Sequence, residues 1–300
     1  MKIGILSNEK WTNAQKNSIG SSRIRVTWPL HYWQDAEEFK IGVKYDVVVF
    51  QKAYFTEYMK YFDGVKILDL CDPDWIDGKP VVEAIELCDA VTVASPGLYG
   101  YVKKLTTKPV FYIPDRVDLE AHQERKNHEG RARSAVWFGY HHNQQVLDAV
   151  LPTIKRLGLD LTVISDLPYT PQSSIQGVDK VWINHHVKNV KYDPETVNQE
   201  IIAGGDFLIN YRPEAGKFVF KSENKTLIGW AIGMPVAKTS EDFDRFMDPY
   251  ERRKEAEMRL QEVVDNWTSD KSVREYVDVI SICLRTREGQ PQVRSEADAL

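Results

Sequence analysis

The chain has 300 residues, of which 42% are hydrophobic and 28% are charged, and its formal net charge is −5. This length allows one large α/β domain or two domains of ordinary size. The negative charge excludes a global basic field that would attract nucleic acid or an anionic membrane, although a local basic cleft is compatible with it.

Cysteine usage and the N-terminal residues bear on the compartment. The three cysteines, Cys71, Cys88 and Cys283, form no Cys-x-x-Cys pair, so neither a disulfide framework nor a thiolate zinc site is expected. The first seven residues contain too short an apolar run for a signal peptide, and no apolar run approaches the length of a membrane span. We therefore expect a cytoplasmic protein without stable membrane insertion.

In the first half, short β-rich runs alternate with helical patterns. Strands are predicted at residues 2–6, 45–50, 65–70, 90–94 and 109–113, and helices at residues 22–33, 56–62, 81–88 and 96–105. The continuous apolar strands are typical of a parallel sheet that is covered on both faces. The alternation of strand and helix predicts a doubly wound α/β fold.

The second half repeats this architecture after a charged segment. Residues 119–133 have almost no large apolar groups, which predicts a linker. Strands follow at 134–138, 159–165, 206–211 and 234–238, and helices at 143–157, 195–203, from 222, 251–267 and 272–284. We predict two Rossmann-like domains, at 1–118 and 134–268, and a C-terminal helix and tail over 269–300, of which 290–300 is expected to fray.

Ligands of open parallel sheets bind beyond the carboxyl ends of the strands. In the first half these positions carry Gly20-Ser-Ser-Arg-Ile-Arg25, Gln51-Lys52 and Asp72-Pro-Asp74. In the second half they carry Gly139-Tyr-His-His-Asn143 and Tyr211-Arg-Pro213. No dinucleotide-binding glycine motif and no P-loop motif occurs. We expect a cleft between the halves in which the second half holds most of the phosphate contacts.

The segment at 218–237, FVFKSENKTLIGWAIGMPVA, is the most informative part of the chain. It places five polar residues at the opening of a short apolar helix: Lys221, Ser222, Asn224, Lys225 and Thr226. A helix N-terminus presents unpaired N–H groups and the positive end of the helix dipole, so it favours an anion. Lys221 and Lys225, one helical turn apart, could both reach that anion. The alternative is an ordinary capped helix with solvated lysines.

Several segments resemble GT-B fold glycosyltransferases of the retaining, family-four type. AVTVASPGLYGYVKKL from residue 90, with KPVFYIPDRVDLE after it, is similar to the family's run into the interdomain linker, where Asn-Gly often stands for Asp115-Arg116. AVWFGYHHN from residue 135 resembles the start of the donor domain, and FKSENKTLIGWAIGMPVA resembles the donor-binding helix. The resemblance covers roughly residues 1–285.

The resemblance implies a nucleotide-sugar donor, expected to be a UDP-sugar, in the second half and a hydroxyl acceptor in the first. It also implies retention of anomeric configuration, a C-terminal helix that crosses back to the first half, and no cofactor or divalent metal. Donor binding is assigned to Gly20, Arg23, Gly139, Tyr140, His141, Lys221, Ser222, Asn224 and Thr226. Catalytic roles are assigned to Asp72, Lys225 and Arg212. The two cations would stabilise the leaving nucleoside diphosphate.

The sequence departs from the family pattern in two places. A glutamate pair that many members carry is replaced here by Phe220 and Ile228, which puts the ribose contacts in doubt. The histidine that often polarises the reaction centre in the N-terminal half has no match. A non-catalytic module that binds nucleotide-sugars is therefore the alternative to an enzyme.

Asp72-Pro-Asp74 allows three interpretations. Its Asp-x-Asp form binds Mn²⁺ or Mg²⁺ in metal-dependent glycosyltransferases of a different fold. The second interpretation is a turn, because Asp and Pro are favoured turn residues. In the third, Asp72 is a base or an electrostatic partner for the acceptor. Because the GT-B resemblance supplies Lys and Arg in place of a metal, we expect catalysis without one.

Histidine and arginine pairs are the remaining candidates. His141-His142 and His185-His186 lack the spacing of metal ligands, and His141 is expected to donate a hydrogen bond to a phosphate or sugar. Arg23 and Arg25 either lie on a helix surface or contact the donor phosphates or an anionic acceptor.

The acceptor class stays open. One candidate is a glycan or lipid-linked precursor, but the first half has no amphipathic basic helix to dock on a membrane. The other is a hydroxymethylated base of DNA, as with phage-encoded glycosyltransferases. Local basic segments at 23–25, 103–104 and 125–133 would line the cleft in that case.

Overall fold

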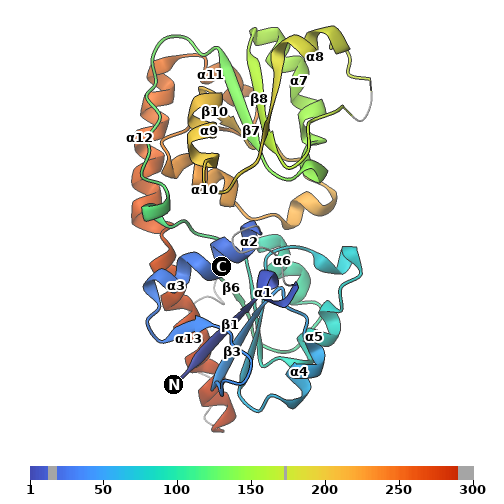
Figure 1. Ribbon diagram of the computed structural model, residues 1–300, viewed down its shortest axis with the longest axis vertical. Helices are drawn as coiled ribbons and strands as arrows, with labels where there is room; N and C mark the ends of the chain where they lie inside the picture. The colour runs from blue at the N-terminus through green and yellow to red at the C-terminus, as the bar shows by residue number, and fades with distance from the viewer. Residues whose placement is uncertain (13–18, 172–173, 290–300) are drawn as a thin grey trace. The chain divides into compact units, whose positions relative to one another are not determined.

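The computed structural model describes residues 1–12, 19–171 and 174–289, and the chain folds into two compact units (Figure 1). The first unit comprises Met1–Arg116, Val219–Glu223 and the chain from Ser269 on. The second comprises Val117–Phe218 and Asn224–Thr268. The tail at 290–300, which was predicted to fray, lies outside the described residues.

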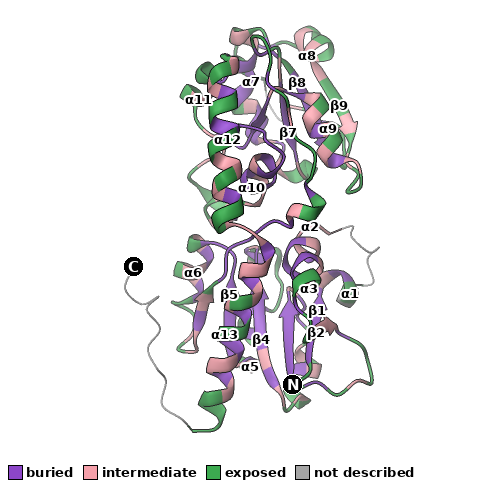
Figure 2. Ribbon diagram, turned by 90° about the vertical axis from the view of Figure 1, so that its left-hand side faces the viewer, coloured by how far each residue is buried: buried purple, intermediate pink, exposed green. Residues whose placement is uncertain are grey.

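A six-stranded parallel sheet forms the centre of the first unit, in the order β2-β1-β3-β4-β5-β6. Its strands are β1 (Ile3–Ser7), β2 (Ala36–Glu38), β3 (Val47–Gln51), β4 (Val65–Leu70), β5 (Ala90–Val93) and β6 (Val110–Tyr112). Every residue of β1, β3 and β5 is buried, as expected for parallel strands between two helical layers (Figure 2). Strand β2 was not predicted, because it is a three-residue, half-buried edge strand.

Helices cover both faces of this sheet. They are α1 (Asn8–Thr12), α2 (Gly20–Ser22), α3 (Trp28–Tyr32), α4 (Thr56–Tyr61), α5 (Val81–Leu87), α6 (Pro96–Val102) and α13 (Ser269–Arg287), with the 3₁₀ turn η2 (Asp74–Asp77). The helix predicted at 22–33 is interrupted by a π-helical turn, η1 (Arg23–Thr27). Helix α13 packs on α3 and β4 and buries Tyr276, Ile280 and Cys283 in the core of the first unit. The predicted return of the C-terminal helix to the first half is therefore confirmed.

A five-stranded parallel sheet, in the order β11-β10-β7-β8-β9, forms the centre of the second unit. Its strands are β7 (Ser134–Phe138), β8 (Asp160–Ser165), β9 (Val187–Lys191), β10 (Phe207–Ile209) and β11 (Val236–Ala237). The helices are α7 (Val146–Leu157), α8 (Lys180–His186), α9 (Val197–Gly204), α10 (Asn224–Ala231), α11 (Ser240–Arg245) and α12 (Pro249–Asn266), with the 3₁₀ turns η3 (Leu119–Ala121), η4 (His141–Asn143) and η5 (Gly216–Phe220). The two parallel sheets and their helices confirm the predicted fold class.

Residues 119–133, for which a linker is predicted, belong to the second unit. Hydrogen bonds from buried polar side chains, rather than apolar packing, fix this segment. Arg252 of α12 is fully buried, and its guanidinium donates to the carbonyl oxygens of Gly130 and Phe246, at 2.7 Å each. His128 is also buried, with Nε2 2.8 Å from the carbonyl oxygen of Gly233. Buried backbone carbonyls that accept such bonds avoid the cost of losing water.

None of the helices in the described part of the chain combines the length and the apolar character that a bilayer crossing requires.

Candidate functional site

Lys225 lies beside the carboxyl end of β7 in the second unit. Its Nζ is 4.2 Å from the centroid of the Trp137 ring and 5.5 Å from that of the Phe138 ring. Gly139 follows with φ of 149°, and a Cβ at this position would clash with Lys225 Nζ. The backbone angle therefore requires glycine here, and an added methyl group would also displace the flexible end of Lys225. The rings hold the cation by cation–π attraction.

Arg212 and Thr226 are joined through Asn210, which follows β10. The Nδ2 of Asn210 donates to Thr226 Oγ1 at 2.8 Å, and Arg212 Nε donates to Asn210 Oδ1 at 3.2 Å. Thr226 is fully buried, so its hydroxyl fixes the opening of α10 against the sheet. The contacts of Asn210 thus place Arg212 and the first turn of α10 at the carboxyl end of the same sheet.

His141 contacts Asp166, the residue that follows β8. Both the backbone nitrogen and Nδ1 of His141 lie 2.7 Å from carboxylate oxygens of Asp166. Burial acts to raise the pKa of Asp166, but the hydrogen bonds from the His141 ring and backbone outweigh it and lower that pKa. When Nδ1 donates to Asp166, the neutral His141 ring carries its acceptor at Nε2, and a protonated ring carries a second donor there. The neighbouring Tyr140 ring, which is 39% exposed, stacks on His142.

Lys221 and Ser222 lie in a different place from the one predicted. Helix α10 begins at Asn224, two residues later than expected, so Lys221 is not on this helix and does not share a helical face with Lys225. We call Val219–Glu223 segment 219–223; it belongs to the first unit. The side chains of Lys221 and Ser222 form hydrogen bonds with Asp72 and Asp115 of that unit.

Three contacts join segment 219–223 to the rest of the first unit. Ser95 Oγ, at the N-cap of α6, donates to the carbonyl oxygen of Phe220 at 2.8 Å. The Phe220 ring meets the stacked rings of Trp75 and Tyr101 edge-on, with centroids 5.3 and 5.7 Å away. Gly97 leaves room for the backbone of the segment, because a Cβ at this position would clash with the carbonyl oxygen of Val219.

Lys221 reaches a cluster of charges at the carboxyl end of the first sheet. We call Lys52, Tyr54, Asp72, Asp74 and Lys221 the Asp72 cluster. Asp72 Oδ2 is 2.7 Å from Lys52 Nζ, and Asp72 Oδ1 is 2.5 Å from Lys221 Nζ. Asp74 contacts Lys52 Nζ at 3.2 Å and accepts a hydrogen bond from Tyr54 Oη at 2.6 Å. Lys52 has φ of 50°, a strained value that is consistent with a position fixed by its surroundings.

The two aspartates of the cluster differ in their electrostatics. Burial acts to raise the pKa of Asp72, but Lys52 and Lys221 outweigh it and lower that pKa to about 2. Burial raises the pKa of Asp74 above its usual value despite the contact with Lys52. Among the described residues, no group of three or more His, Cys, Asp or Glu side chains is arranged to hold a metal ion. The ammonium groups of Lys52 and Lys221 balance the negative charge of Asp72.

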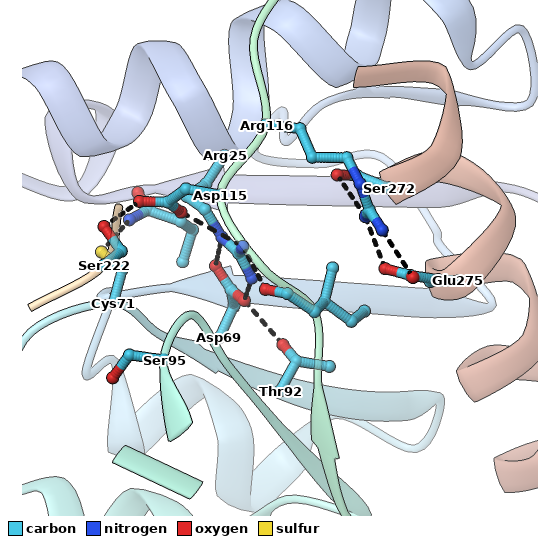
Figure 3. A network of polar contacts seen from close by, with 12 residues as sticks. Arg25, Asp69, Cys71, Thr92, Ser95, Asp115, Arg116, Ser222, Ser272 and Glu275 are labelled. Carbon is cyan, nitrogen blue, oxygen red and sulfur yellow. Dashed lines mark hydrogen bonds and ion pairs between the residues drawn. The ribbon is translucent and has the colours of Figure 1, made fainter. Parts of the chain in front are cut away.

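Arg25 lies in the interior of the first unit rather than beside a ligand (Figure 3). Its guanidinium donates to Asp69 Oδ2 at 3.1 Å and Oδ1 at 2.5 Å, to the carbonyl oxygen of Ile113 at 2.6 Å, and to Asp115 Oδ1 at 3.3 Å. Asp115 also accepts a hydrogen bond from Ser222 at 2.5 Å. Both alternatives given for Arg25 are therefore wrong: its side chain is buried rather than on a helix surface, and two buried carboxylates and a carbonyl engage its donors in place of a phosphate or an acceptor.

The same network extends to helix α13. Asp69 accepts hydrogen bonds from Thr92 at 2.6 Å and from Tyr276 at 2.9 Å. Arg116 forms a two-pronged ion pair with Glu275, at 2.6 and 2.7 Å. A sequence signal existed for this network, since Asp69 follows the apolar Ile67 and Leu68 near the end of β4, and a buried carboxylate needs a cationic partner.

The other predicted residues of the first half have less defined surroundings. Gly20 opens α2, and a Cβ at this position would meet nothing within 4 Å, so the fold does not require glycine there. Arg23 opens the π-helical turn, with its guanidinium carbon 6.0 Å from the centroid of the Trp28 ring. His185 and His186 end α8 in the second unit, where His186 contacts Asp160 at 2.8 Å.

No family model matches the sequence, and no curated protein matches it significantly. Solved structures do match. AviGT4, a glycosyltransferase involved in avilamycin A biosynthesis, gives a TM-score of 0.58 at 10% identity, covering 95% of this chain and 98% of that one. T4 phage BGT, solved in complex with its UDP-glucose substrate, gives 0.56 at 10% identity, covering 94% and 99%. The chain therefore has the GT-B fold that the sequence predicted.

Proposed function

We propose that the protein is a glycosyltransferase that moves a sugar from a nucleoside-diphosphate sugar, expected to be a UDP-sugar, to a hydroxyl acceptor. Support comes from one observation above all: two glycosyltransferases share its fold over almost the full length of both chains. One of them was solved with UDP-glucose. Because one fold can host more than one chemistry, the activity has to be argued from the residues at the carboxyl ends of the strands.

The second unit supplies the groups that a donor diphosphate requires. Negative charge develops on the diphosphate as its bond to the sugar breaks, and fixed cations aimed at that charge lower the barrier. Lys225 is held by two aromatic rings and Arg212 by Asn210, so neither has to be ordered during the reaction. We assign both to the diphosphate, and His141 to a hydrogen bond with a phosphate or sugar oxygen.

In the first unit, Asp72 is the proposed acceptor-side residue. Its lowered pKa means that it is ionised at neutral pH and is a weak base while both lysines contact it. An electrostatic partner for positive charge on the reacting sugar fits this state better than a general base does. We propose that no divalent cation takes part, because Lys and Arg side chains supply the positive charge that a metal would supply.

The acceptor classes differ in their support. A nucleic-acid acceptor needs basic side chains that are available to phosphates. Part of the basic segment at 125–133 is engaged elsewhere: Lys126 Nζ donates to the carbonyl oxygen of Ile202 at 2.8 Å, and Arg125 to that of Glu124 at 2.9 Å. This weakens the case for DNA, and we propose that both glycan hydroxyls and hydroxymethylated bases be tested.

The test combines donors with a mixed set of acceptors. The protein is incubated with UDP-glucose, UDP-galactose or UDP-N-acetylglucosamine and with glycans, hydroxymethylcytosine DNA or unmodified DNA, and sugar transfer is detected by mass spectrometry. Transfer that is lost in Lys225→Ala supports the proposal. Donor binding without transfer to any acceptor would favour the non-catalytic module. The replacement of the family's glutamate pair by Phe220, which packs against Trp75, and by the buried Ile228 is consistent with that alternative. No binding of any nucleotide-sugar would contradict both functions.

A further inference from the structure

The pair His141 and Asp166, at the carboxyl end of the second unit's sheet, decides which ring atom His141 offers to a ligand. Carboxylate oxygens of Asp166 lie 2.7 Å from the backbone nitrogen and from Nδ1 of His141. Burial acts to raise the pKa of Asp166, but these hydrogen bonds lower it, so the carboxylate is an anion at neutral pH and only accepts hydrogen bonds. Nδ1 therefore carries a proton, and Nε2, at the other edge of the ring, is left for the ligand.

The His141 ring is accessible and lies at the edge of the proposed diphosphate site. The side chain of His141 is 46% exposed and that of Asp166 is 37% exposed. In the part of the chain that the structure describes, no hydrogen bond engages Nε2. His141 follows two residues after Gly139, where an added Cβ would clash with Lys225 Nζ. Because two residues span at most about 7 Å along the backbone, His141 belongs to the same site as Lys225.

A neutral His141 is unsuited to a phosphate while Asp166 holds its Nδ1 proton. The neutral ring then has a lone pair at Nε2, and this lone pair repels a phosphate oxygen. The negative charge of Asp166 behind the ring repels it as well. A protonated ring has an N–H at both edges, so it donates to Asp166 and to the phosphate and separates the two anions.

Two lysines of the second unit also lie near this loop. Lys217 Nζ donates to the carbonyl oxygen of His142 at 3.0 Å, and the His142 ring centroid lies 5.4 Å from that of His141. Lys225 contacts the start of the loop. In the free protein these cations disfavour a further positive charge on the loop, whereas Asp166 favours one. A bound diphosphate offsets the charge of the lysines, so binding shifts the balance towards the protonated ring.

We propose that Asp166 makes donor binding proton-dependent: His141 takes up a proton at Nε2 when the donor diphosphate binds, and the imidazolium donates to Asp166 and to a phosphate oxygen. The proton comes from the solvent, and no other bond is made or broken. This rests on the proposed function and specifies it, because a contact of His141 with a sugar hydroxyl requires no proton. Asp166 is a positioning residue, since it acts on the donor through His141.

Asp166→Asn isolates the role of the carboxylate. The amide keeps the oxygen that accepts from the backbone nitrogen of His141, and it places an N–H donor opposite Nδ1. The neutral ring then accepts at Nδ1 and carries its proton at Nε2, which suits a phosphate without further protonation. We expect this variant to bind UDP-glucose without proton uptake and, at about pH 8, at least as tightly as the natural protein. A purely structural Asp166 predicts weaker binding at every pH.

Titration calorimetry of the full-length protein with UDP-glucose measures the proton uptake. This donor is the suitable probe because its diphosphate is esterified at both ends, whereas free UDP has a terminal phosphate that itself titrates at about pH 6. Binding enthalpies in Hepes and in Tris at about pH 7.5, where ordinary imidazole is mostly neutral, give the number of protons. We expect uptake of up to about one proton, and an affinity that falls by up to about tenfold for each unit of rising pH.

Matched variants show which histidine takes up the proton. His141→Gln offers an amide donor that does not titrate, so proton uptake should vanish and the affinity should no longer depend on pH. His186 and Asp160 form the control pair: they are also an imidazole and a carboxylate, 2.8 Å apart, but Asp160 opens β8 and so lies at the opposite end of the sheet. Asp160→Asn and His186→Gln should leave proton uptake unchanged.

Binding of UDP-glucose without proton uptake, or uptake that persists in His141→Gln, would overturn the proposal and leave the proposed function standing. Uptake that persists in Asp166→Asn would overturn it as well. If the natural protein binds neither UDP-glucose nor UDP-galactose nor UDP-N-acetylglucosamine, the proposed function itself is contradicted. Circular dichroism and thermal unfolding check that the variants fold, and His141→Gln still tests the uptake should Asp166→Asn fail to fold.

Discussion

The two units share a parallel α/β architecture but hold the cations at their sheet ends in different ways. In the first unit, carboxylates contact them: Arg25 meets Asp69, and Lys52 meets Asp72. In the second unit, Lys225 lies against aromatic rings. Ion pairing and cation–π attraction are two different ways to hold a cationic side chain in place. We therefore expect substitution of the first unit's buried cations to act mainly on stability, and substitution of Lys225 to act mainly on donor binding.

The largest effect is expected from Arg25 in the first unit. Arg25→Met removes the cation from a buried network and leaves Asp69 and Asp115 without it, which should lower the free energy of unfolding by about 3–5 kcal/mol. Arg156→Met in the second unit is the matched control, since Arg156 and Asp244 form an ion pair with both side chains 54% exposed. Urea unfolding should show little or no change in stability for this control. Similar losses in both variants would remove the contrast between buried and exposed pairs.

Lys225 should dominate turnover. Lys225→Ala removes a fixed cation from the proposed diphosphate site, and kcat should fall by about a hundredfold to a thousandfold, the scale for a single electrostatic donor. Steady-state rates of sugar transfer measure this. Lys180→Ala, an exposed lysine on α8 of the same unit, should leave kcat unchanged. Unchanged kcat together with unchanged UDP affinity in Lys225→Ala would refute the role of Lys225.

Gly139 tests whether the position of the Lys225 ammonium group matters. Gly139→Ala should displace this group and weaken UDP binding by about tenfold, equivalent to roughly 1.4 kcal/mol. Gly158→Ala is a control for backbone strain alone, because Gly158 has φ of 68° and a Cβ there would meet nothing within 4 Å. Its UDP affinity should be normal even though its stability falls. Equal weakening in both variants would attribute the effect to strain rather than to Lys225.

A smaller effect is expected from acid on the Asp72 cluster. The folded-state pKa of Asp72 is about 2, below the ordinary value of 3.8, so its ion pairs add stability above pH 4 and lose it as the pH falls from about 4 towards 2. The difference in free energy of unfolding between the natural protein and Asp72→Asn should therefore shrink over this range. A difference that stays constant with pH would mean that Asp72 is not stabilised as an anion.

Removal of divalent cations should have the smallest effect. Because we assign charge stabilisation to Lys225 and Arg212, sugar transfer should continue in EDTA at an unchanged rate. Loss of transfer in EDTA and recovery with Mn²⁺ would make Asp72 and Asp74 metal ligands. The first unit would then also bind a ligand, and the contrast between the units would be lost.

Much of the fold was predictable because buried parallel strands carry a strong local signal. Residues 65–70 and 134–138 were predicted with the bounds that β4 and β7 have in the structure. Strand β9 was missed because its sequence, VKNVK, is polar and lies at the edge of the sheet. The π-helical turn was missed because residues 22–33 look like a continuous helix, and the hydrogen bonds of Arg25 to Asp69 that accompany this turn are tertiary.

The candidate site was predictable only in part, for a similar reason. Gly139 and Lys225 could be placed at strand and helix ends from local patterns, although their contact with each other could not. Lys221 was placed on the helix by its spacing from Lys225, but Ser95, Trp75 and Asp72 hold segment 219–223 on the first unit. Contacts between residues more than a hundred positions apart leave no periodic signal in a single sequence.

Hydrogen–deuterium exchange with and without UDP tests the central claim most directly, namely that the second unit holds the donor at the carboxyl ends of its strands. Saturating UDP should slow exchange in peptides that cover 139–143, 210–213 and 224–228, and leave α8 and β9 unchanged. Protection that is confined to α8 and β9, or absent from all peptides of the second unit at a concentration where calorimetry shows binding, would contradict the account.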